Sequence, residues 1–145
     1  MNEFVVQNQV SEHWLKSTTA DGLISYTLTG VIILTPFQGT GSDWRRQRVS
    51  FGVKIPELPA GMALHLRYWA PFVTLNSISN DHQAVDAGWA VDTFGVDNPW
   101  QPQNEVSVFC DIAVRDVDGF VARLGYVLHL VGEPGPGPSI SGVPS

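Results

Sequence analysis

Apolar and polar residues alternate one by one along most of this chain. The clearest stretches are residues 49–55, 62–68, 87–91, 106–114 and 120–130. Successive side chains of a β-strand point to opposite faces of the sheet, so a period of two indicates strands with one buried face. No window shows the i, i+3, i+4, i+7 spacing of an amphipathic helix. The pattern predicts an all-β domain.

Three further segments are rich in β-forming residues but alternate less regularly. Residues 23–37 predict one long or bent strand with a bulge or bend at Gly30, and residues 72–78 predict a second strand. Residues 3–9 predict an edge strand. Residues 9–18 predict a short helical turn at most.

Short segments with glycine, proline and polar residues separate these strands. Residues 56–61 predict a turn, and Asp118-Gly119 predicts a tight hairpin because Asp-Gly tolerates the positive φ that such turns need. Strands at this short spacing, without a βαβ unit, are typical of sandwiches and barrels. We therefore predict a single domain over residues 1–131, an antiparallel β-sandwich of seven or eight strands.

The composition changes at Gly132, from which glycine and proline alternate up to Pro138. Proline lacks an N–H donor and glycine loses the most conformational entropy on ordering, so this segment favours neither helix nor sheet. Residues 132–145 are predicted to be a disordered tail or the remnant of a linker.

Composition excludes several classes of protein. The 145 residues suffice for one core without a disulfide or a metal, and the single cysteine, Cys110, has the apolar parity of its strand. A net charge of −6 lacks the basic footprint of nucleic-acid binding, although Arg45, Arg46 and Arg48 form one short basic cluster. The sequence shows neither a signal peptide nor a membrane span, so a cytoplasmic origin is the default expectation.

The residues that most often carry catalysis form no recognisable motif. The four histidines, at positions 13, 65, 82 and 129, are scattered without metal-ligand spacing, and no nucleophile elbow or phosphate-binding loop is present. We predict no catalytic residue, no metal and no cofactor.

Tryptophan is the more informative residue, with five in the chain. A sugar ring has one apolar face and a rim of hydroxyls, so its site needs an aromatic plane with polar groups at the edge. Two places have these ingredients, and the candidate ligand-binding residues are Trp44 with Asp43 and Arg45, and Trp100 with Asn98 and Gln101. The alternative is that these rings cover the ends of the sandwich or lie in a subunit interface. Trp89 has the parity of a core residue.

The segment 71–78, which begins with proline and ends with Ser-Ile, resembles a strand of H-type lectin domains. Residues 106–108, 114–120 and 126–131 are similar to later strands of that family. The resemblance implies a six-stranded sandwich, trimers or hexamers, and binding of sugars of the N-acetylgalactosamine type. The chain departs from the family in its long 80–103 segment and in one continuous strand after Phe120, and no sugar-contacting position carries over.

We therefore expect a non-catalytic, carbohydrate-binding, lectin-like module that is a homo-oligomer, with a glycan or small molecule as ligand and neither nucleic acid nor membrane as partner. One alternative is a structural subunit of a phage or surface appendage. Another is a small β-barrel enzyme, similar to a cyclase, with an enclosed apolar pocket that contains His65 or Asp111.

Overall fold

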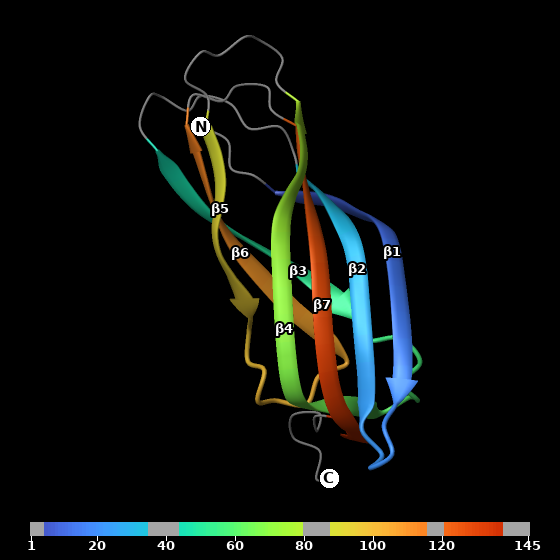
Figure 1. The fold of residues 1–145 in the computed structure, drawn as a ribbon. Coiled ribbons are helices and arrows are strands. Elements are labelled where there is room, and N and C mark those ends of the chain that lie inside the picture. Colours follow the sequence, from blue (N-terminus) through green and yellow to red (C-terminus); the bar gives the residue numbers. More distant parts are fainter. Residues whose placement is uncertain (1–4, 35–43, 80–87, 116–120, 138–145) are drawn as a thin grey trace.

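The computed structural model describes residues 5–34, 44–79, 88–115 and 121–137, which form seven strands in two antiparallel sheets (Figure 1). The strands are β1 (Val6–Thr18), β2 (Ile24–Leu34), β3 (Arg45–Lys54), β4 (Met62–Ser79), β5 (Gly88–Val96), β6 (Glu105–Arg115) and β7 (Val121–Pro136). These described residues contain no helix. The predicted all-β sandwich is confirmed.

The two sheets have different widths. One holds four strands in the order β1-β2-β7-β4, and the other holds three in the order β3-β6-β5. Figure 1 shows β3 and β6 crossing behind the four-stranded sheet at an angle. Only β1–β2 and β5–β6 are consecutive strands that pair with each other, so the other connections join the two sheets. The predicted hairpin at Asp118-Gly119 is therefore wrong, because β6 and β7 belong to different sheets; the dipeptide itself lies outside the described residues.

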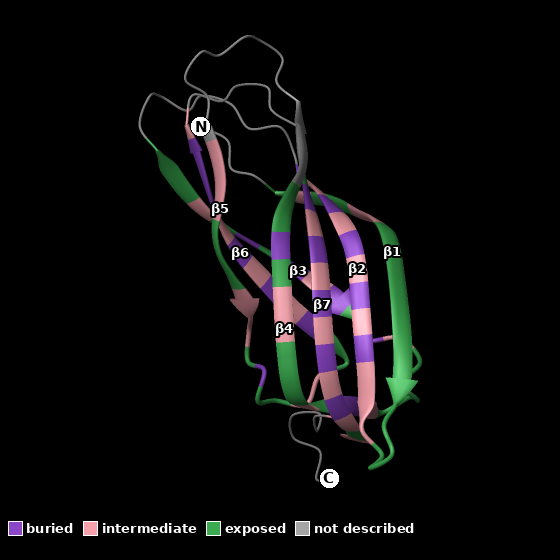
Figure 2. Cartoon of the chain, in the orientation of Figure 1, coloured by how far each residue is buried: buried purple, intermediate pink, exposed green. Residues whose placement is uncertain are grey.

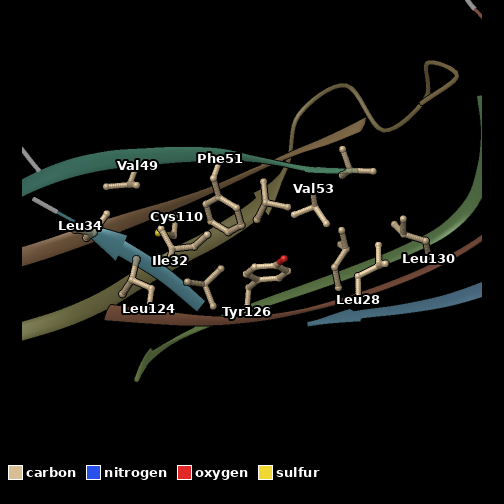
Figure 3. Packing of buried hydrophobic residues seen from close by; sticks show 14 of the residues in the cluster. Leu28, Ile32, Leu34, Val49, Phe51, Val53, Cys110, Leu124, Tyr126 and Leu130 are labelled. Carbon is tan, nitrogen blue, oxygen red and sulfur yellow. The ribbon is translucent and has the colours of Figure 1, made fainter. Parts of the chain in front are cut away.

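One apolar layer lies between the sheets. Burial alternates along β2 and β7, as the banding in Figure 2 shows, because every second side chain points inward. Figure 3 shows these side chains meeting those of the opposite sheet, and the rings of Phe51 and Tyr126 pack with their centroids 5.2 Å apart. The buried side chains of the described part of the chain are all apolar, apart from the tyrosine hydroxyls at its margin. Removal of this surface from water drives the two sheets together.

β1 corrects the prediction for residues 9–18, which form no helical turn. The strand continues to Thr18 and pairs with β2 through a tight turn, in which the Thr19 N–H donates to the Leu23 carbonyl at 2.8 Å. Gly22 has a φ of 86° in this turn, which glycine adopts without strain. The edge strand predicted over residues 3–9 overlaps the start of β1, which is an edge strand of its sheet. Its continuation to Thr18 escaped detection because nearly all of its side chains are exposed, so no alternation marks it.

The irregularity that was predicted at Gly30 lies in the neighbouring strand. Gly30 pairs in regular register with Tyr126 of β7, whereas the register shift falls in β1 between Val10 and His13, where Ser11 has a φ of 55°. Glycine is needed at position 30 for another reason. A Cβ there would come within 2.6 Å of the Tyr126 ring, so only a residue without a side chain lets this ring pack.

β4 and β7 are both longer than predicted. The separate strands predicted over 62–68 and 72–78 are one 18-residue strand with register shifts near Arg67 and Asn76. The prediction that Gly132 begins a disordered tail is wrong for residues 132–136, because β7 continues to Pro136 beside β4. β2 ends opposite Gly132, so beyond this point β7 has one neighbour and tolerates prolines as an edge strand does. Residues 138–145 lie outside the described part.

The close approach at Gly30 gives a testable consequence. We expect Gly30→Ala to lower the free energy of unfolding by about 1–3 kcal/mol, because Tyr126 is buried and cannot yield to the added methyl group. Gly95→Ala is the matched control, since its Cβ would meet the Phe109 ring, which lies on a solvent-facing side and can move. Urea denaturation measures both, and an equal effect of the two substitutions would contradict the explanation.

Candidate functional site

The unequal widths of the sheets leave the inner side of β1 open. Trp14 and Lys16 point to this side, since they pair with the buried Leu28 and Tyr26 of β2. Leu28 is 3% exposed, whereas Trp14, in the next strand outward, is 44% exposed. Figure 2 shows β1 exposed along most of its length. The three-stranded sheet covers β2 but does not extend far enough to cover β1.

A cleft of about 500 Å³ lies between β1 and β3. Its apolar floor belongs to the core, where Leu28, Tyr126 and Val53 lie close to one another (Figure 3). Trp14 lines the wall that β1 provides. The cleft therefore offers a largely apolar base beside an accessible aromatic ring.

Polar side chains surround this base. Gln9 and Glu12 come from β1, Lys54 from the end of β3 and Glu105 from the start of β6. The carboxylate of Glu105 lies over Gly52, where any side chain would collide with it. The rim thus carries two carboxylates, one ammonium group, one amide and the imidazole of His13 around the apolar base.

Two tyrosines stiffen the cleft. The Tyr26 hydroxyl donates to the Pro56 carbonyl at 2.9 Å and so ties β2 to the turn that follows β3. Burial, with the nearby charge of Glu57, raises the pKa of Tyr26. Burial is also the main cause that raises the pKa of Tyr126 to about 12, with a contribution from Glu12. Tyr126 therefore lines the cleft as a neutral phenol at physiological pH.

The structure places the sequence-predicted candidates at two distant points. Trp44 and Arg45 lie where β3 begins, at the end of the sheet where Arg45 pairs with Val114. Trp44 is exposed, but the Arg115 guanidinium lies 5.1 Å from its ring centroid. Asp43 lies outside the described residues.

The second group of candidates lies past the opposite end of β5. Trp100 is 76% exposed in the turn before β6, and Gln101 beside it is also exposed. The Asn98 carbonyl accepts hydrogen bonds from the Gln101 N–H at 3.1 Å and from Gln103 Nε2 at 2.6 Å, so Asn98 organises the turn. Trp89 packs against the core, as predicted. Neither candidate group lines the cleft under β1.

Trp14 is the residue that the sequence analysis missed. Its neighbours Glu12 and His13 give it the same mixture of an aromatic ring and polar groups that singled out Trp44 and Trp100. The available signal was therefore composition, and it was overlooked because residues 9–18 had no recognisable strand pattern.

The residues expected in an enclosed catalytic pocket lie elsewhere. His65 is exposed, and Asp111 lies on the outer face of the three-stranded sheet. Cys110 is fully buried, and burial raises the pKa of its thiol to about 11, which leaves it unreactive as a nucleophile. Within the described residues no group of three His, Cys, Asp or Glu side chains could hold a metal ion. No described helix is long and apolar enough to cross a membrane.

Asp111 organises the outer face of the three-stranded sheet. It accepts two hydrogen bonds from Arg48 of β3, at 2.8 and 3.0 Å, and one from Thr93 of β5 at 2.5 Å, so one carboxylate links all three strands. Arg46 pairs with Asp92 in the same region. The Arg48 guanidinium also lies 4.1 Å from the Phe109 ring centroid. This network fixes the sheet that forms one side of the cleft.

Comparison of the chain with protein-family models, with curated proteins and with solved structures finds no match. Family membership is therefore not shown, and the resemblance to H-type lectin domains stays a prediction.

The Asp111 network predicts a specific acid sensitivity. The Arg48 and Thr93 hydrogen bonds lower the pKa of Asp111 from 3.8 to about 2. A lowered native pKa stabilises the fold above the unfolded value, and this stabilisation is lost as the pH falls from about 4 to about 2. We expect Asp111→Asn to lower the free energy of unfolding at pH 7 by up to about 1 kcal/mol and to weaken its dependence on pH in that window. Urea denaturation at several pH values measures both effects, and identical acid slopes in the two proteins would refute this role.

Proposed function

We propose that this chain is a non-catalytic, lectin-like binding module that holds a sugar ring in the cleft under β1. The observation that carries this proposal is Trp14, an accessible indole at a cleft whose base is apolar and whose rim is polar. The volume of about 500 Å³ falls within the range of about 300–1,000 Å³ that is usual for small-molecule sites.

The chemistry of the cleft suits a carbohydrate. The C–H face of a sugar ring packs on an aromatic plane, which Trp14 supplies. Its hydroxyls need charged or amide partners around the edge, which Glu12, Glu105, Lys54 and Gln9 supply. Long side chains at a solvent-open rim bind with modest strength, so we expect weak affinity for a single ring.

The charged groups at the rim restrict which sugars the cleft would bind. Glu12 and Glu105 together outweigh Lys54 at the rim. A uronic or sialic acid would place a third carboxylate among these groups and would be repelled. The cleft therefore favours neutral, N-acetylated or amino sugars over acidic ones.

The test combines a glycan array of neutral, N-acetylated and sialylated structures with calorimetric titration of the strongest hit. We expect hits among the uncharged glycans, and Trp14→Ala should weaken the titrated affinity about ten-fold, equivalent to ~1.4 kcal/mol. Trp100→Ala and Trp44→Ala are matched controls, because these exposed rings lie outside the cleft. Both controls should bind as the wild type does.

Three outcomes would overturn the proposal. An array without hits would exclude glycans as the ligand. If Trp100→Ala lost binding and Trp14→Ala retained it, the site would lie at the turn before β6 instead of in the cleft. Two carboxylates in one cleft are also the ingredients of glycoside hydrolysis. Mass spectrometry of the bound glycan after long incubation checks this point, since release of a sugar would show an enzyme rather than a binding module.

A further inference from the structure

The outer face of the four-stranded sheet has a central region without formally charged side chains. Its register aligns four successive rows, each with one residue from every strand, from the row of Ser17 and Tyr68 to the row of Val10 and Thr74. None of the residues in these rows is Asp, Glu, Lys or Arg. We call this surface the neutral face.

Large apolar side chains stand on the neutral face. Leu15 is 74% exposed, Tyr68 is 55% exposed and Phe72 is 51% exposed, and the half-buried Val127 and Val131 lie between the two edge strands. A sheet face that remains in water usually carries polar residues at such positions. Tyr68, Phe72, Val127 and Val131 occupy neighbouring positions of β4 and β7, whereas Thr27 and His129 separate Leu15 from them. The Phe72 ring also packs against Phe94 of β5, with the centroids 5.8 Å apart. Exposed apolar clusters of this kind mark interaction surfaces.

The outer face of the other sheet provides an internal comparison. It carries the ion pairs Arg46–Asp92 and Arg48–Asp111, which is the composition of a solvated surface. The three-stranded sheet therefore carries charges along its outer face, whereas the described part of the four-stranded sheet carries them only beyond the four central rows, at Arg123 and at the Arg67–Glu133 ion pair. We infer that two copies of this chain pack together through their neutral faces as a back-to-back dimer.

Charge favours a second copy over other occupants. Copies with a net charge of −6 repel one another, and the neutral face is where they can meet without opposing like charges. A two-fold dimer brings a surface against itself, and a surface without formal charge meets this requirement. A basic partner or a nucleic acid would need charged side chains that the four rows do not contain.

The size of the neutral face sets the strength of the dimer. Four strands about 4.8 Å apart and about seven residues long, at roughly 3.3 Å per residue, give a footprint of about 450 Å² per copy. The dimer would bury about 900 Å², which is below the roughly 1,200–2,000 Å² of stable complexes and within the range of weak, transient ones. We therefore expect a reversible dimer that forms in the micromolar range or above.

This arrangement leaves the proposed sugar sites accessible. Most of the cleft lining lies on the inner side of β1 and on β3, whereas the dimer uses the outer side of the four-stranded sheet; His13 and Thr29 of one neutral-face row also line the cleft. One dimer would thus present two clefts, and two weak sites on one particle bind a surface with many glycans more tightly than one site does. The dimer can be tested without any glycan, so its failure and that of the sugar proposal are distinguishable.

The experiment is sedimentation velocity of the full chain from low micromolar to millimolar concentration. We expect the wild type to move from a mass of 15.8 kDa towards twice that mass. Val127→Lys, in the middle of the neutral face, should remain monomeric throughout. Ser50→Lys is the matched control, because it adds the same charge to an exposed position on the outer face of the other sheet and should dimerise as the wild type does.

Tyr68→Lys is a second variant, which keeps the test valid if Val127→Lys in the central strand β7 fails to fold. This residue is on an edge strand and exposed, so the variant should fold and still lose the dimer. Circular dichroism and thermal melting check that each variant is folded. The inference would be overturned if the wild type stayed monomeric, formed an oligomer other than a dimer, or still dimerised in both face variants. It would also be overturned if the chain were a monomer that binds a different protein through this face.

Discussion

The packing of two sheets of unequal width over one apolar layer determines the rest of this structure. β2 and β7 lie at the centre of the wider sheet and bury every second side chain against β3 and β6. The narrower sheet cannot cover a fourth strand, so β1 keeps its backbone pairing to β2 while its inner side stays open. The cleft is therefore a consequence of how the strands are divided between the sheets, and any change that added a strand beside β3 would close it.

The sequence predicted the strands whose two faces have different environments. β3 and β6 were recognised because burial on one face enforces alternation. β1 was predicted only at its start, by the edge strand over residues 3–9, because both of its faces are exposed. Its hairpin to β2 was not predicted, although Asp21-Gly22 carries the same signal that was taken from Asp118-Gly119. The dipeptide predicts a local turn, but it cannot show whether the flanking strands pair with each other or lie in different sheets.

The candidate site was harder to predict than the fold. Local composition correctly suggested that Trp44 and Trp100 are accessible, yet Trp100 stands on an exposed turn and Trp44 has Arg115 over its ring. Trp14 gains its importance from the register that aligns it with Leu28 and from the missing strand opposite β1. Both are long-range properties, and a single sequence does not contain them in a form that residue periodicity can reveal.

The two proposals depend on different sides of the same sheet, and this separation has a physical basis. An inner side that faces an incomplete partner sheet can hold a small ligand, because the core supplies an apolar base and β1 supplies the rim. The four central rows of the outer side carry no formal charge, so we propose a second copy of the same surface as their partner. A second sheet would not fit into a cleft of about 500 Å³. We therefore propose a different class of partner for each surface, with His13 and Thr29 contributing to both.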